Sequence, residues 1–522
     1  MDNVGDFEKG QMIVEVRQLS PSTSGTVNFV ACQLFALLTA CWFRLYLHPS
    51  KTSPFIRHVV ATLLGFYLAL FCFGWYALHF LVQSGLTYGI MIFTGVEHMH
   101  RYCFVVALGY LTLCQITRVY VFDYGMYSAD FTGKVRQVWM FVFTGLTKKE
   151  EHLKPTQRYL AVRKMPSLLE YLSYNCNFLG ILAGPTCSYN DYTTFIEGTG
   201  YQHRHVESNG KENGKFKQSD PSPKQAVLVK LSTCALCLLI YLFFYRICPV
   251  ERVIEDPYIT SQPFYLRILY LYLSMLSLRP KYYFVWTLAD AINNAAGLGF
   301  NGYNKDGTPR WDLISNLRIL EIESATSFKT FLDNWNIQTA LWLKRVCYER
   351  CPYHPTAATF LLSAIWHGVY PGYYFTFITG IAMTLAARAV RHNVRQHFLG
   401  SSTLKLIYDV ITWASTQIAI CYTVVPFVVL SVGASLKFYC AEHHLKSCRE
   451  KNRSSQRRPA TSPAQTATAT TKRKLPEGTG CTRPSTSYNT ELWRNWHRDP
   501  RAREAFFPLF LSPNLNKDDT KT

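Results

Sequence analysis

One histidine lies in the middle of a long uncharged stretch of this 522-residue chain. His367 stands in LLSAIWHGVYPGYYFTF, and the run from Pro355 to Ala387 contains no Asp, Glu, Lys or Arg. Ionisable side chains inside such apolar segments are costly and commonly mark functional sites. Removal from water disfavours the cation, and a neutral imidazole is what a general base needs. His367 is therefore either a candidate base or a histidine hydrogen-bonded within a helix bundle.

A second group of polar side chains lies in FLDNWNIQTALWLKRVCYER, residues 331–350. The carboxamide of Asn336 can donate to a carbonyl oxygen as negative charge develops on that oxygen. Asp333 and Asn336 also precede an amphipathic segment, so either residue can instead cap a surface helix. Downstream, Lys344 and Arg345 form a basic pair suited to a polyanion such as the phosphates of coenzyme A.

A third polar group consists of Asp290, Asn293 and Asn294, which fall within about one helical turn of each other. Small residues around them permit close helix packing. These side chains fit a structural hydrogen-bond network at least as well as direct contact with a substrate.

The composition indicates which elements must position these groups. Hydrophobic residues make up 48% of the chain and charged residues 17%, against about 25% charged residues in soluble domains. Uncharged runs long enough to cross a bilayer alternate with short charged connectors. The sequence therefore predicts an all-α, polytopic transmembrane helical bundle with about ten spans. We expect them near residues 27–47, 57–77, 80–97, 102–121, 226–247, 264–278, 282–300, 355–371, 372–390 and 405–433.

Other regions do not fit a simple span. Residues 167–196 predict a short buried or re-entrant helix, broken at Gly184-Pro185. Residues 301–350 predict amphipathic helices at the membrane surface. Their apolar side chains at helical spacing are Trp311, Leu313, Ile314, Leu317 and Leu320. We divide the chain into a polar N-terminal segment (1–25), a membrane domain (26–437) and a basic, low-complexity tail (438–522) that we expect to be disordered.

The charge and the cysteines narrow the function. A formal charge of +20 suits cytoplasmic loops that face anionic membrane lipids. No folded basic domain or motif accompanies the charge, so no nucleic-acid partner is expected. The 16 cysteines show no zinc spacing, and no metal site is expected. The N-terminus lacks a cleavable signal pattern, so the span near 27–47 is expected to target the chain to the endomembrane system.

The residues also carry a resemblance. The asparagine of DNWN, followed by the histidine of SAIWHG, resembles the paired signature of the membrane-bound O-acyltransferase superfamily. The stretches SLLEYLSYNCNFLGILAGP, RPKYYFVWTLADAINNAAG and RWDLISNLRI are similar to its lysophospholipid branch, and the likeness covers most of residues 27–437. Residues 134–146 are shorter than the family's segment, and the tail replaces a further hydrophobic span. A catalytically impaired splice form therefore stays an alternative.

The resemblance implies transfer of an acyl chain from acyl-CoA to the free hydroxyl of a lysophospholipid in the endoplasmic reticulum membrane. His367 would be the general base and Asn336 the stabiliser of the carbonyl oxygen, with acyl-CoA as co-substrate and no further cofactor. The expected acceptor is lysophosphatidylethanolamine, with lysophosphatidylcholine or lysophosphatidylserine as alternatives, and the expected donor is oleoyl-like. A transporter or scramblase lined by polar side chains is the competing class. Substrate contacts are expected from Asn334, Trp335, Trp311, Asp312, Lys344, Arg345, Asn293, Asn294, Trp366 and Tyr370.

Overall fold

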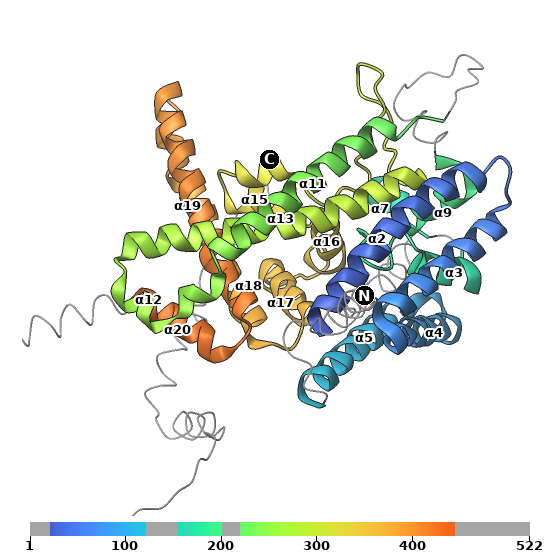
Figure 1. The fold of residues 1–522 in the computed structure, drawn as a ribbon, viewed down its shortest axis with the longest axis horizontal. Helices are drawn as coiled ribbons and strands as arrows, with labels where there is room; N and C mark the ends of the chain where they lie inside the picture. The colour runs from blue at the N-terminus through green and yellow to red at the C-terminus, as the bar shows by residue number, and fades with distance from the viewer. Residues whose placement is uncertain (1–20, 122–154, 163, 201–219, 444–522) are drawn as a thin grey trace, which may run out of the picture. The chain divides into compact units, whose positions relative to one another are not determined.

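The computed structural model describes residues 21–121, 155–162, 164–200 and 220–443 (Figure 1). Within these residues the fold is helical, with no strand and two isolated antiparallel bridges. The predicted all-α fold is confirmed for this part of the chain. Most of the predicted N-terminal segment, the atypical stretch 134–146 and the predicted tail beyond residue 443 lie outside the described residues.

The described helices follow each other closely along the chain. Those before residue 262 are α2 (Pro21–Tyr46), α3 (Pro54–Phe73), η1 (Gly74–Ala77), α4 (Leu78–Phe93), α5 (Gly95–Ile116), η2 (Thr117–Val121), α7 (Pro155–Leu160), α8 (Leu168–Cys176), α9 (Tyr189–Glu197), α11 (Lys224–Ile247), η5 (Val250–Ile254) and α12 (Asp256–Ser261). Those after it are α13 (Phe264–Ala296), α14 (Ile319–Glu323), α15 (Phe328–Asn334), α16 (Ile337–Leu343), η6 (Lys344–Tyr348), α17 (Pro355–His367), α18 (Pro371–Asn393), η7 (Arg395–Phe398), α19 (Ser402–Val429) and α20 (Val432–His443).

Five segments among the described residues are long and apolar enough to cross a membrane. They confirm a multi-pass membrane protein, and the first agrees with the span predicted near 27–47. α17 has 13 residues, and at about 1.5 Å per residue it is too short to cross a hydrocarbon core of about 30 Å. The five segments are Val27–Tyr46, Pro54–Phe93, Lys224–Ile254, Pro371–Asn393 and Ser402–Val429.

The two spans predicted at 264–278 and 282–300 are one helix, and that prediction is wrong. α13 runs for 33 residues through Pro280, and α11 lies beside it (Figure 1). Basic residues such as Arg279 and Lys281 are typical of a membrane boundary, but Arg279 is buried. Its guanidinium donates to Glu323 at 2.7 Å and to Gln417 at 2.9 Å. Because this charge is satisfied by protein groups, the helix has no need to end there.

The amphipathic helices predicted within residues 301–350 form from Ile319 onward, and the helical interpretation of residues 311–318 is wrong. Two backbone bonds, from Asn301 to Arg310 and from Arg310 to Gly302, close a turn. The chain then runs without a helix to Ile319, and Leu317 bridges Trp335. Of the apolar side chains at helical spacing, Trp311 and Ile314 are therefore buried by a folded loop rather than along one helix face, and Leu320 is exposed on α14.

The broken element predicted at 167–196 is confirmed, but the break comes earlier. A capping box between Ser167 and Glu170 starts α8. The helix ends before Asn177, and Gly184-Pro185 lies in the loop that leads to α9. This buried element packs against α3, α4 and α9.

A small core joins the helices that carry the candidate catalytic residues. Ala107 of α5, Trp342 and Leu343 of α16, and Leu362 of α17 form one buried cluster. The region of Asn336 and the region of His367 are thus packed on the same early helix.

Candidate active site

Asn336 stands at the start of α16 in a left-handed backbone conformation, with φ 50° and ψ 50°. Asparagine adopts this conformation more readily than most residues with a side chain. Its side chain makes no capping bond to the helix backbone. Asp333 lies within α15 and pairs with Lys329. Neither residue therefore caps α16 with its side chain, which contradicts the capping alternative.

The carboxamide of Asn336 has a defined orientation. The backbone N–H of Gln338 donates to Oδ1 of Asn316 at 3.0 Å, and a backbone N–H can only donate. The other end of the Asn316 amide is therefore its NH2, which donates to Oδ1 of Asn336 at 3.0 Å. The hydroxyl of Thr339 donates to the same oxygen at 2.6 Å.

Two donors thus occupy the oxygen of Asn336. Its NH2 is left with no acceptor among the described residues. An amide held by its oxygen with its donor end available is the arrangement that binding of a developing oxyanion requires. Asn316 and Thr339 were not among the predicted residues. The helical spacing of three between Asn336 and Thr339 was a usable signal for the second contact.

His367 closes α17 and is half-buried among aromatic rings. The imidazole lies 5.0 Å from the ring of Phe427, 5.3 Å from Phe377 and 5.7 Å from Tyr373, centroid to centroid. Trp366 stands 4.1 Å away. These rings restrict the orientation of the imidazole and exclude water from much of its surface.

The backbone around His367 depends on glycine. Gly368 has φ 150°, and a Cβ there would lie 2.9 Å from the Tyr373 ring. A Cβ on Gly372 would lie 2.1 Å from the Pro426 carbonyl oxygen. α17 ends at His367 and α18 begins at Pro371, close to the predicted boundary between the segments 355–371 and 372–390.

The two regions meet through their helices. α16 contacts α17, and the Trp342 ring lies 6.5 Å from that of Trp366. The structure therefore brings the helix that follows Asn336 against the helix that ends in His367.

Asn334 and Trp335, the other predicted residues of DNWN, form framework contacts. Asn334 is buried, donates to the Thr330 carbonyl at 2.9 Å and accepts from Arg318 at 3.4 Å. The ring of Trp335 packs edge-on against Trp286, with centroids 5.4 Å apart. A direct substrate role for either residue stays a prediction.

The predicted pair Asn293 and Asn294 belongs to a buried polar network. Asn293 donates to the Leu179 carbonyl at 3.3 Å. Asn294 donates to the Trp311 carbonyl at 3.1 Å, and Lys230 donates to the same oxygen at 2.8 Å. The ammonium of Lys230 also pairs with Asp290 at 2.7 Å. These contacts favour the structural interpretation of this group.

The remaining predicted residues have different surroundings. Asp312 is exposed and accepts from Asn301 at 2.8 Å. Trp366 is buried, and Tyr370 is half-buried with its ring 6.2 Å from that of Tyr373. Lys344 is exposed, whereas Arg345 is half-buried.

Burial lowers the pKa of the Arg345 guanidinium from its usual value, while Glu349 and Asp191 act in the opposite direction. A partly desolvated cation of this kind gains from an anionic partner.

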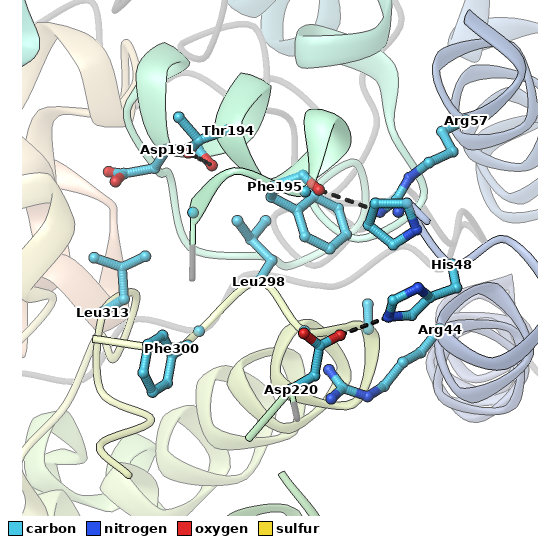
Figure 2. A pocket seen from close by; sticks show the side chains of 16 residues that line it. Arg44, His48, Arg57, Asp191, Thr194, Phe195, Asp220, Leu298, Phe300 and Leu313 are labelled. Carbon is cyan, nitrogen blue, oxygen red and sulfur yellow. Dashed lines mark hydrogen bonds and ion pairs between the residues drawn. The ribbon is translucent and has the colours of Figure 1, made fainter. Parts of the chain in front are cut away.

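A cavity of about 40 Å³ lies elsewhere, where α2 and α3 meet α9 (Figure 2). His48 bonds Asp220 at 2.5 Å, and Arg57 donates to the Phe195 carbonyl at 3.2 Å. Arg44 donates to the Pro221 carbonyl at 2.9 Å. The charged side chains that line this cavity bond to other groups of the protein. Neither Asn336 nor His367 lines the cavity. It is not part of the candidate active site.

Membrane-crossing helices, with an available amide donor and an imidazole on contacting helices, are features that acyl transfer in a membrane requires. The chain belongs to the membrane-bound O-acyltransferase family, whose profile matches residues 22–429.

Three relatives show how similar the chain is to known members. It is 66% identical over 420 residues to membrane-bound glycerophospholipid O-acyltransferase 2 of Gallus gallus, covering 79% of this chain and 81% of the relative. Identity to the type 2 protein of Homo sapiens is 64% over 425 residues, covering 80% and 82%. Identity to the type 1 protein of Mus musculus is 53% over 420 residues, covering 79% and 85%. The predicted family and enzyme class are confirmed.

Proposed function

We propose that this enzyme transfers a fatty acyl chain from acyl-CoA to the free hydroxyl of a lysophospholipid, in the endoplasmic reticulum membrane. The observation that carries the proposal is the Asn336 amide, whose oxygen is occupied and whose NH2 has no acceptor among the described residues. The names of the similar proteins, which are glycerophospholipid O-acyltransferases, support this acceptor class.

His367 acts as the general base in this proposal. A hydroxyl is a poor nucleophile at neutral pH and needs a base within hydrogen-bond reach to accept its proton. The half-buried imidazole among Phe377, Phe427 and Tyr373 suits an acceptor that is itself amphipathic. The hydroxyl oxygen attacks the thioester carbonyl carbon as its proton passes to His367.

Asn336 stabilises the carbonyl oxygen during the attack. Negative charge grows on this oxygen in the tetrahedral intermediate, and an oriented N–H donor lowers the energy of that state. Collapse of the intermediate breaks the carbon–sulfur bond and releases coenzyme A, whose thiolate takes the proton from His367. No acyl-enzyme, resident metal or further cofactor is required.

Coenzyme A, which carries the acyl chain, binds through its phosphates to the basic residues that follow α16. Lys344 is exposed and Arg345 half-buried at the end of the same helical segment that begins at Asn336. Guanidinium and ammonium groups bind phosphates by charge-assisted hydrogen bonds. We propose lysophosphatidylethanolamine as the preferred acceptor, with the choline and serine forms as alternatives, and an oleoyl-like donor.

The test uses the purified full chain with oleoyl-CoA and a panel of lysophospholipids. Release of coenzyme A should occur only when a lysophospholipid is present, together with formation of the matching diacyl phospholipid. Movement of lipid between the two leaflets of a vesicle membrane, without consumption of acyl-CoA, would support a scramblase instead. No turnover with any acceptor, but turnover after restoring a family-length segment at 134–146, would identify an impaired splice form.

A further inference from the structure

Gln115, near the end of α5, reaches the residue that precedes the proposed base. Its side chain is 5% exposed, and its Nε2 donates to the Trp366 carbonyl oxygen at 3.3 Å. The contact joins two parts of the chain that lie far apart in sequence.

The Trp366 carbonyl lies where a helix needs outside donors. The last four carbonyl groups of an α-helix have no partner within the helix. α17 ends at His367, and the Gly368 N–H turns back to the Ala364 carbonyl at 3.1 Å. Gln115 therefore supplies a donor to the final turn of α17.

Gln115 also lies close to the residue on the other side of the histidine. A Cβ built on Gly368 would lie 3.9 Å from the Cδ atom of Gln115. The carboxamide thus bonds to the residue before His367 and lies close to the residue after it. We propose that Gln115 is a positioning residue, which fixes the end of α17 so that His367 is presented to the acceptor hydroxyl; this rests on the proposed role of His367.

The bond from Gln115 to the Trp366 carbonyl comes with a local cost. The Oε1 of Gln115 is buried and has no hydrogen-bond partner among the described residues. A buried acceptor without a donor is unfavourable, and a leucine of similar size would avoid that cost.

The chain offers a matched control in Gln83 of α4. This residue is also buried, donates to a backbone carbonyl (that of Ala107) at 3.2 Å, and leaves its Oε1 without a partner. No proposed catalytic residue contacts that carbonyl. Gln83→Leu and Gln115→Leu therefore remove the same kind of bond in two different places.

The first measurement is kcat and KM for oleoyl-CoA, per amount of folded, purified full chain. Gln115→Leu should lower kcat roughly ten- to a hundredfold, because small displacements of a catalytic group are costly. The KM of Gln115→Leu for oleoyl-CoA should stay within about twofold of the native value, because Lys344 and Arg345, the groups proposed to bind coenzyme A, are unchanged. Gln83→Leu should keep kcat within about twofold. Equal values of kcat in the two variants would overturn the proposal.

The second measurement is the pH profile of Gln115→Glu. Only the protonated carboxyl can donate to the Trp366 carbonyl, while the ionised form repels it. The ratio of its kcat to that of the native enzyme should therefore rise as pH falls. A ratio that does not change with pH would also overturn the proposal.

His367→Ala belongs in the same panel. If it is inactive while Gln115→Leu retains full turnover, the role of Gln115 is wrong and the proposed function stands. If His367→Ala turns over normally, the proposed function itself fails.

Discussion

The two halves of the candidate active site are held in different ways. Asn336 is held by polar side chains, because Asn316 and Thr339 both donate to its oxygen. His367 is held by aromatic rings and by the glycine that ends its helix. An amide helps only if its donor end faces the substrate, so directional bonds must fix it. A base must exchange a proton during turnover, and the apolar rings around His367 restrict the orientation of its imidazole.

The largest expected effect comes from Asn336 itself. Asn336→Ala removes the donor to the carbonyl oxygen and should lower kcat roughly a hundred- to a thousandfold. The check is turnover of purified protein together with its thermal midpoint. Asn304→Ala, in an exposed turn, is the control and should be unaffected. A loss of folding without a specific loss of turnover would assign Asn336 to structure.

The packing of aromatic rings around His367 is tested next by Gly368→Ala. The added Cβ approaches the Tyr373 ring at 2.9 Å, and φ of 150° is unfavourable for alanine. We expect a loss of about 1–3 kcal/mol in stability and a fall in turnover at temperatures where the variant is folded. Gly85→Ala, where a Cβ meets nothing within 4 Å, should change neither. Equal behaviour of the two variants in calorimetry and turnover would contradict the packing described around His367.

The hydrogen bonds that hold the side chain of Asn336 are tested by Thr339→Val. Loss of the 2.6 Å bond leaves Asn316 as the one described donor to the Asn336 oxygen. Turnover should fall about tenfold, in line with the loss of one buried hydrogen bond. Thr339→Ser should keep most of the native turnover, because serine also carries a hydroxyl that can donate to the Asn336 oxygen. Thr412→Val removes a threonine hydroxyl that donates to a backbone carbonyl within α19, and a tenfold loss there as well would mean that the effect is not specific to Asn336.

The smallest effect is expected from Asp333→Asn. Asp333 pairs with Lys329 at the surface, with side-chain exposures of 56% and 78%. Exposed pairs contribute little, so stability should change by less than about 1 kcal/mol and turnover by less than about twofold. A severe loss of turnover would show that Asp333 belongs to the active site. It would contradict the description of Asn316 and Thr339 as the polar groups that hold the Asn336 side.

The sequence predicted the helical membrane fold because long uncharged runs have few alternatives in a bilayer. The span at Val27–Tyr46 follows directly from that pattern. It did not predict the single long α13, because basic residues beside Pro280 are typical of a membrane boundary. The burial of Arg279 against Glu323 and Gln417 depends on helices that are distant in sequence.

The candidate site was predicted in its two central residues but not in what holds them. His367 was detectable as an ionisable group in an apolar run, and Asn336 through its resemblance to a known signature. Asn316 and Gln115 carry no such signal, because their partners lie far along the chain and no periodicity links them. Such contacts follow from tertiary packing alone.

The central claim is that His367 accepts the proton of the acceptor hydroxyl. Its most direct test is the rate of lysophospholipid-dependent coenzyme A release by purified His367→Ala, beside His392→Ala on the exposed end of α18 as the control. We predict a loss of roughly a hundred- to ten-thousandfold for His367→Ala, with an unchanged control and unchanged protein yield. Normal release by His367→Ala would contradict the account.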